Sequence, residues 1–296
     1  MSPSVQKAAV NGIEIAYQTF GEPTNPPMLL IMGLGTQMIA WPEEFCNDLA
    51  DHGLFVIRFD NRDVGESTHI NGEPAPGLAD LLLKRKPLAY RIEDMADDAT
   101  GLMDALGLQS AHIVGASLGG FIAQTIALRA PKRVRSLSLI MTSTGSRRVG
   151  QAKPKLLLRM LKRRDVADRH AAIAATIDTF RLIGSQGYAF DEERLSEIAG
   201  QSYDRGYNPD GYLRQLAAAT HQPNRTKALA AVEAPTLVMH GLGDPLIAVS
   251  GGVALARAIP GARFVGFNGM GHDLPRALWP EFTAEILELA NPTDQS

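Results

Sequence analysis

The chain has 296 residues, of which 45% are hydrophobic and 21% are charged, and its formal net charge is −3. This composition is typical of a globular protein, and the small negative charge disfavours a nucleic-acid binder, which would carry a basic surplus. No apolar stretch approaches the roughly 20 residues of a membrane span, and no secretory leader is visible at the start. We therefore expect a cytoplasmic α/β domain with an insertion, without stable membrane insertion.

The first half of the chain alternates between expected strands and expected helices. The dipeptide Asn11-Gly12 predicts a β-hairpin within residues 5–20. Further strands are expected at 28–32, 54–59, 111–114 and 134–141, and helices at 41–52, 92–106 and 120–130. A polar excursion with a leucine cluster, Leu81–Leu83, is expected at 68–90. This alternation predicts a mainly parallel central sheet that is flanked by helices on both faces.

Residues 143–230 break the alternation. Their apolar residues recur at helical spacing, and Asp191 and Asn208 are typical helix starts. We expect an all-helical insertion of about four helices that lies over the site as a cap. The sheet resumes with strands at 235–239 and 262–267 and helices at 253–259 and 275–289. The expected division is a core of residues 1–142 and 231–296 with a helical cap of residues 143–230.

One serine lies between the strand at 111–114 and the helix that follows. The pentapeptide Gly115-Ala116-Ser117-Leu118-Gly119 has the pattern G-x-S-x-G, which holds a serine on a tight strand-to-helix turn with its hydroxyl exposed. The glycines are needed because no Cβ fits where strand and helix nearly touch. The pentapeptide alone is a modest signal, and the alternative is a glycine-rich turn with a bystander serine.

Two further loops at predicted strand ends carry partners for this serine. Asp244 lies in a Gly-Leu-Gly-Asp-Pro turn, and His272 lies in a Gly-Met-Gly-His turn. Singly, the aspartate is typical of a turn and the histidine of a surface. Together they follow Ser117 in the order of a known serine-hydrolase triad. His272 would take the proton of the serine hydroxyl and Asp244 would orient the imidazole, so we predict that these three residues are catalytic.

These motifs resemble those of the α/β-hydrolase fold enzymes over nearly the full length of the chain. More narrowly, residues 31–35, 41–45 and 58–63 are similar to a bacterial carboxylesterase and lipase branch that includes esterases related to aclacinomycin methylesterase. The resemblance implies hydrolysis of small-molecule carboxylic esters through an acyl-enzyme, without a cofactor. No metal is expected, because no cluster of Cys, His or Asp has metal-ligand spacing. Perhydrolysis, lactone hydrolysis and C–C bond hydrolysis on the same triad remain as alternatives, as does a non-enzymatic, ligand-binding member of the fold.

The oxyanion hole can be placed on the same grounds. One donor is expected to be the backbone N–H of Leu118, directly after the nucleophile, and the other the backbone N–H of Leu34, in the loop after the strand at 28–32. Many relatives have His-Gly at the start of this loop, where this chain has Met32-Gly33. The departure matters little if the donor is a backbone N–H.

A substrate pocket is expected between the core and the cap. Met38, Trp41 and Phe121 are candidates for its lining. The leucine-rich insertion favours an apolar substrate over a charged one.

Other reactive side chains have structural interpretations. His240 and the single cysteine, Cys46, are interpreted as packed residues, and the charges at 60–63 as a turn network rather than substrate contacts. The basic segment at 153–164 is interpreted as a solvated amphipathic cap helix, with transient contact with a lipid surface as the alternative. Asp273 adjoins His272, but neighbouring side chains on an extended turn point in different directions, so Asp244 is the preferred acid.

Overall fold

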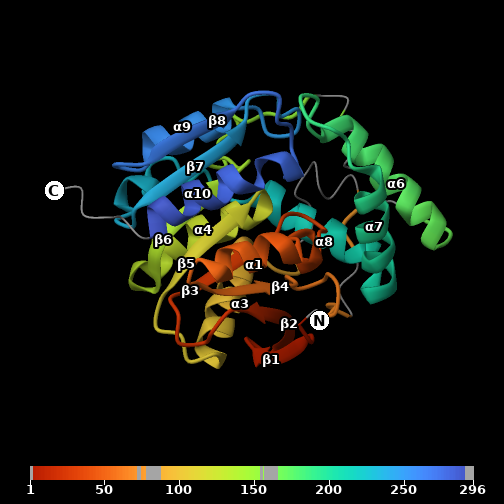
Figure 1. The fold of residues 1–296 in the computed structure, drawn as a ribbon, viewed down its shortest axis with the longest axis horizontal. Coiled ribbons are helices and arrows are strands. Elements are labelled where there is room, and N and C mark those ends of the chain that lie inside the picture. The colour runs from red at the N-terminus through yellow and green to blue at the C-terminus, as the bar shows by residue number, and fades with distance from the viewer. Residues whose placement is uncertain (1–2, 72–74, 78–87, 154–155, 157–165, 291–296) are drawn as a thin grey trace.

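An eight-stranded sheet in the order β1-β2-β4-β3-β5-β6-β7-β8 forms the middle of the molecule (Figure 1). It comes from a computed structural model that describes residues 3–71, 75–77, 88–153, 156 and 166–290. The strands are β1 (Gln6–Val10), β2 (Ile13–Phe20), β3 (Pro27–Ile31), β4 (Phe55–Phe59), β5 (Ala111–Ala116), β6 (Val134–Ile140), β7 (Thr236–Gly241) and β8 (Arg263–Phe267). β2 pairs antiparallel with β1 and with β4, and every neighbouring pair from β4 to β8 is parallel. The prediction of a mainly parallel sheet is confirmed.

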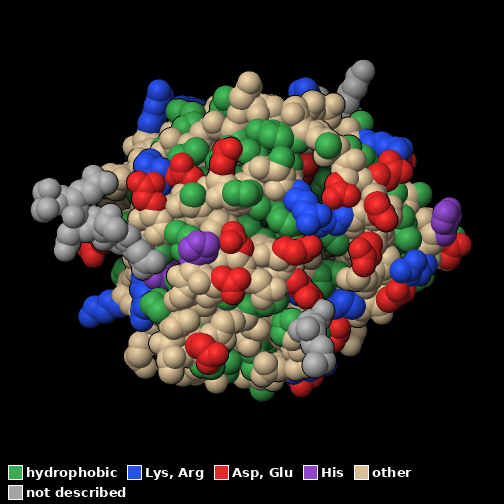
Figure 2. Space-filling view, in the orientation of Figure 1, with side chains coloured by type: hydrophobic (Ala, Val, Ile, Leu, Met, Phe, Trp, Pro, Cys, Tyr) green, Lys and Arg blue, Asp and Glu red, His purple; other side chains and the backbone are tan. Residues whose placement is uncertain are grey.

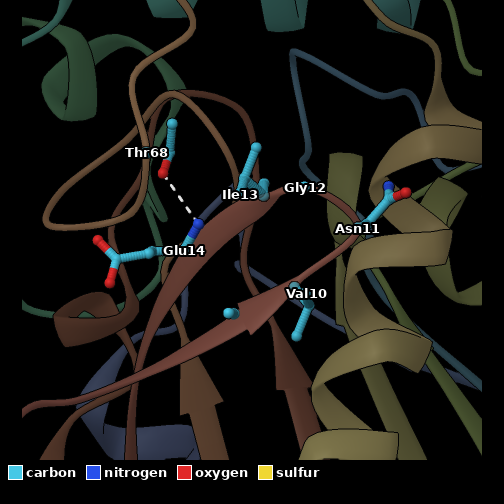
Figure 3. A pocket seen from close by; sticks show the side chains of 7 residues that line it. Val10, Asn11, Gly12, Ile13, Glu14 and Thr68 are labelled. Atoms are coloured by element: carbon cyan, nitrogen blue, oxygen red, sulfur yellow. Dashed lines mark hydrogen bonds between the residues drawn. The ribbon is translucent and has the colours of Figure 1, made fainter.

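The antiparallel end of the sheet begins with the predicted hairpin. Asn11 and Gly12 have φ values of 48° and 77°, the left-handed conformations that a two-residue hairpin turn requires. A hollow beside this turn is lined by residues 9–14 and by Thr68, whose hydroxyl accepts a hydrogen bond from the Glu14 N–H at 2.9 Å (Figure 3). The predicted catalytic residues are not part of this lining.

Helices cover both faces of the sheet. They are α1 (Glu43–Asp51), α3 (Ile92–Ala105), α4 (Leu118–Arg129), α9 (Ser250–Ala258) and α10 (Trp279–Ala290), with short 3₁₀ helices at η1 (Met38–Ala40), η2 (Pro131–Arg133), η3 (Ala228–Ala231) and η4 (Arg276–Leu278). Helices α1 and α10 pack on one face, and α3, α4 and α9 pack on the other. In β3, Met28 and Leu30 face the first layer, and Leu29 and Ile31 face the second. Burial on both faces explains the continuous apolar run of this strand.

Three described helices lie between β6 and β7, and we call them the cap helices. They are α6 (Arg169–Ile183), α7 (Glu192–Gly206) and α8 (Pro209–His221), and they gather at one end of the molecule (Figure 1). The side chains of Asp168, Asp191 and Asn208 each accept a backbone N–H in the first turn of the helix that follows. The leucine cluster Leu81–Leu83 and most of the basic segment at 153–164 lie outside the described residues. The division into core and cap remains a proposal.

Buried ion pairs attach the cap helices to the loop after β4. Arg214 of α8 lies 2.8 Å from the carboxylate of Asp63, and their side chains are only 5% and 0% exposed. Arg205 of α7 lies 2.8 Å from the carboxylate of Asp60, which is also fully buried. Burial alone would raise the pKa of Asp63, but hydrogen bonds from Arg214, the Ile70 N–H and Tyr90, together with the charge of Arg214, outweigh burial and lower it. Asp60 and Asp63 therefore join the cap helices to the core, while Arg62 pairs with Asp98 of α3 at 2.6 Å, in keeping with the structural interpretation of these charges.

Replacing Arg214 with methionine should lower the free energy of unfolding by about 3–5 kcal/mol, because the Asp63 carboxylate would stay buried without its guanidinium partner. Urea denaturation measures this loss. The matched control is Arg169→Met, which removes an ion pair with Asp204 that is about half exposed and should cost at most about 1 kcal/mol. Equal losses in the two variants would contradict the prediction.

Folding lowers the pKa of Asp63, so the pair contributes its full stability above the unfolded pKa of about 3.9. This contribution should be lost as the pH falls through the lower pKa of the folded state.

The surface mixes charges of both signs. On the face seen in Figure 2, acidic and basic side chains are interspersed among apolar ones. This face therefore offers no large basic patch that would attract a polyanion.

Among the described helices, none combines the length and the apolar character needed to cross a bilayer.

Candidate active site

Ser117 lies in the predicted turn between β5 and α4. Its φ of 54° and ψ of −115° are strained for a residue with a side chain. A Cβ on Gly115 would lie 2.3 Å from the carbonyl oxygen of Gly119, and a Cβ on Gly119 would lie 2.1 Å from that of Ile31. Only glycine permits these approaches, so the packing of strand against helix explains the G-x-S-x-G spacing.

The loops after β7 and β8 bring Asp244 and His272 to this serine. The Nε2 atom of His272 lies 3.0 Å from Ser117 Oγ, and its Nδ1 atom lies 2.7 Å from Asp244 Oδ2. The other carboxylate oxygen of Asp244 accepts the N–H groups of Leu246 and Ile247 at 2.8 and 2.9 Å. The backbone thus holds one oxygen of the carboxylate, and the other faces the imidazole.

This arrangement has a defined chemical capability. A carboxylate on Nδ1 favours the tautomer with a proton on that atom, which leaves the lone pair of Nε2 facing the Ser117 hydroxyl. The imidazole can therefore withdraw the proton of the serine and later deliver a proton to a leaving group. Burial of Asp244 and His272 keeps the two groups in a less polar environment, where their interaction is stronger.

The loop after β3 passes beside the serine. A Cβ on Gly33 would lie 3.2 Å from the Cβ and 3.7 Å from the Oγ of Ser117, and Leu34 is the next residue in this loop. Leu118 is the first residue of α4, where N–H groups lack an acceptor within the helix. Both predicted oxyanion donors thus belong to segments that adjoin Ser117, and their role remains a prediction.

Comparison with known proteins identifies the family to which this fold and these motifs belong. A profile of the α/β hydrolase fold matches residues 26–275, which include all three candidate catalytic residues. The chain belongs to the α/β-hydrolase fold family. Two curated relatives are rhodomycin D methylesterases: DauP of Streptomyces sp. (strain C5) is 29% identical over 288 residues, and DnrP of Streptomyces peucetius is 28% identical over 287 residues. Each alignment covers 90% of this chain and 91% of the relative.

Solved structures agree with the family assignment. The crystal structure of a hydrolase from Pseudomonas aeruginosa has a TM-score of 0.73 at 25% sequence identity and covers 97% of this chain and 98% of that chain. The predicted α/β-hydrolase fold is confirmed, and so is the resemblance to this family.

The last residue of α6 and the segment that follows it lie beside the loop after β8, which carries His272. The N–H of His272 donates to the carbonyl of Ile183 at 2.7 Å, and the N–H of Gly271 donates to Ser185 Oγ at 3.0 Å. The Ser185 hydroxyl in turn donates to Asp273, a half-buried residue whose carboxyl pKa is raised by desolvation. Asp273 therefore faces Ser185, while Asp244 faces the imidazole. Ser185 was not identified from the sequence, because a serine after a helix carries no distinctive signal.

His240 is buried beneath the Asp244 loop. Its Nε2 atom lies 2.8 Å from the carbonyl of Ile247, to which a neutral ring can donate, and 3.6 Å from Asp244 Oδ2. Burial lowers the pKa of His240, which favours this neutral ring. These contacts agree with its interpretation as a packed residue.

The three candidate pocket residues are all buried, but they contact different side chains. Met38 and Trp41 are fully buried, and the indole of Trp41 stacks on Phe45 with ring centroids 5.8 Å apart. Phe121 is also buried, in the first turns of α4, and the Arg225 guanidinium lies 5.8 Å from its ring centroid. Contact of Met38, Trp41 or Phe121 with a substrate remains a prediction.

The single cysteine has the surroundings of a core residue. Cys46 is a residue of α1 that is buried in the apolar layer between this helix and the sheet, and burial raises the pKa of its thiol to about 12. Within the described ranges, no three or more His, Cys, Asp or Glu side chains are grouped as a metal site would require.

Proposed function

We propose that this protein is a serine hydrolase that cleaves carboxylic esters of apolar substrates through an acyl-enzyme. The observation that supports the proposal is the pair of short contacts that connects Ser117 Oγ through the His272 imidazole to Asp244. The two rhodomycin D methylesterases, which align over nine-tenths of the chain, support an ester as the substrate.

The first half of the reaction acylates the enzyme. The Ser117 hydroxyl gives its proton to His272 Nε2 while its oxygen bonds to the ester carbonyl carbon. The carbonyl oxygen takes up the electron pair of its double bond, and the N–H groups of Leu34 and Leu118 stabilise the resulting oxyanion. The tetrahedral intermediate then expels the alcohol, which takes the proton from His272, and the acyl group stays on Ser117.

The second half releases the acid. A water molecule gives a proton to His272 Nε2 and bonds to the acyl carbon, which regenerates an oxyanion in the same place. Collapse of this intermediate breaks the bond to Ser117 Oγ, which recovers its proton from His272. Asp244 stabilises the imidazolium in both halves. The sum is ester plus water to carboxylic acid plus alcohol.

The surroundings of Leu34 support an apolar substrate. Leu213, Leu216 and Ala217 of α8 form an apolar cluster against which Leu34 packs. A charged group of a substrate beside Leu34 would lie near this buried cluster and would lose hydration without gaining a partner, whereas an apolar group would not.

The proposal predicts turnover of p-nitrophenyl and methyl esters. Esters with apolar acyl chains should be hydrolysed, with release of p-nitrophenol or of acid, and Ser117→Ala should abolish the release because it removes the nucleophile. Acetate with hydrogen peroxide and a halide tests the perhydrolase alternative in parallel, since a peracid would oxidise the halide. Halide oxidation without ester turnover would favour that alternative. A folded wild-type protein that turns over neither substrate would contradict the proposal.

A further inference from the structure

One side chain of α8 bridges the loop after β3 and the loop after β4. Gln215 is 0% exposed. Its Oε1 atom accepts the N–H of Gly35 at 2.8 Å, and its Nε2 atom donates to the carbonyl of Arg62 at 2.8 Å. Each end of the amide thus has a partner of the opposite kind, and a reversed amide would set donor against donor and acceptor against acceptor.

The loop held by Gln215 is a tight turn around Leu34. The N–H of Thr36 donates to the carbonyl of Gly33 at 3.3 Å, which closes a four-residue turn with Leu34 and Gly35 in its middle. Gly35 has a φ of +63°, and a Cβ there would lie 2.6 Å from the ring of Tyr212, which also belongs to α8. The closing hydrogen bond uses the N–H of Thr36, so the N–H of Leu34 is not consumed by the turn.

The helix that carries Gln215 is itself fixed to the core. Arg214, the preceding residue, makes the buried ion pair with Asp63. Asn208 Nδ2, at the start of α8, donates to the carbonyl of Asp63 at 3.1 Å. The Gln215 amide therefore reaches the turn from a rigid support, which is what a positioning group requires.

We propose that Gln215 is a positioning residue that holds the turn at residues 33–36 and thereby aims the N–H of Leu34 at the oxyanion formed on Ser117. The proposal rests on the proposed function, because it requires an oxyanion at that place. It also gives α8 a part in the chemical step, in addition to the substrate pocket that is expected between the core and the cap.

The test is Gln215→Met, which keeps the length of the side chain and removes both amide groups. Loss of a whole oxyanion donor costs about 10²–10³ in kcat, so misplacing one donor should lower kcat for p-nitrophenyl acetate about 10- to 100-fold, with KM little changed. Affinity for an alkyl trifluoromethyl ketone should fall by the same factor, because its hemiketal with Ser117 carries the oxyanion. Gln201→Met on α7 is the matched control, since this exposed glutamine bonds to Glu197 of its own helix, and it should behave as wild type.

Several outcomes would overturn the proposal. A kcat of Gln215→Met equal to that of wild type would do so, and so would a fall in kcat without loss of affinity for the ketone, which is the signature of a merely structural role. If the methionine variant does not fold, Gln215→Asn keeps the amide but shortens its reach by one methylene, and it should lower kcat and affinity for the ketone together. Wild-type behaviour of the asparagine variant would also overturn the proposal. Failure of the proposed function would appear in the wild-type protein itself, as absence of ester turnover.

Discussion

Ser117→Ala should lower kcat for ester hydrolysis by about 10⁶, the loss measured when the nucleophile of a serine hydrolase is removed. The hydroxyl lies 3.0 Å from His272 Nε2, and alanine leaves the imidazole with no group to deprotonate. The variant should fold normally, because alanine occupies the same backbone conformation and removes one hydroxyl. Thermal melts of both proteins check the fold, and turnover of p-nitrophenyl esters checks the activity.

Covalent labelling supplies an independent readout for the same residue. An organophosphonate should add once to the wild-type protein, and mass spectrometry of the digest should place the adduct on the peptide that contains Ser117. Ser196→Ala is the matched control, because Ser196 lies on α7 and its hydroxyl donates to the Glu192 carbonyl. This control should keep both turnover and labelling. An adduct on another peptide, or ester turnover by Ser117→Ala near the wild-type rate, would refute the assignment.

Asp244→Asn should lower kcat by about 10⁴, the effect of the corresponding change in a serine protease. The backbone N–H groups of Leu246 and Ile247 can still bond to the remaining side-chain oxygen, so the fold should survive. The new amide group would then face His272 Nδ1 and favour the tautomer whose Nε2 carries the proton. That tautomer cannot accept the proton of Ser117, which is the reason for the loss.

The control for this prediction is the neighbouring acid, Asp273. Its carboxyl accepts the Ser185 hydroxyl, so Asp273→Asn keeps an acceptor there and should cost far less in kcat. Steady-state kinetics of both variants, with thermal melts, make the comparison. If Asp273→Asn lost more activity than Asp244→Asn, the choice of Asp244 as the acid would be wrong.

Local signals in the sequence were sufficient to predict the order of the helices and strands along the chain. The Asn11-Gly12 hairpin and the turn at Ser117 were predictable because they depend on backbone conformations and close approaches that only a few residues permit. The helix starts at Asp191 and Asn208 were predictable because their side chains cap the first turn within three residues.

The proximity of the candidate catalytic residues was predictable for a topological reason. Neighbouring parallel strands end at the same edge of a sheet, so the loops that carry Ser117, Asp244 and His272 had to converge there. The surroundings of Met38 and Trp41 were not predictable in the same way. An apolar side chain near such a loop can face a pocket or the core, and only the packing of the surrounding layers shows that both are buried.

The sequence by itself therefore determined the α/β architecture, the turn at Ser117 and the edge of the sheet where the candidate site lies. The tertiary structure alone decided how the cap helices touch that site. Gln215 contacts Gly35 across 180 residues, and Ser185 contacts Asp273 across 88. Periodicity reports the face that a helix buries but not its partner, and a glutamine on a helix or a serine after one looks like any solvated residue. The contact of Gln215 exists because a buried ion pair and apolar packing set α8 against the loops of the core, and no local pattern specifies that placement.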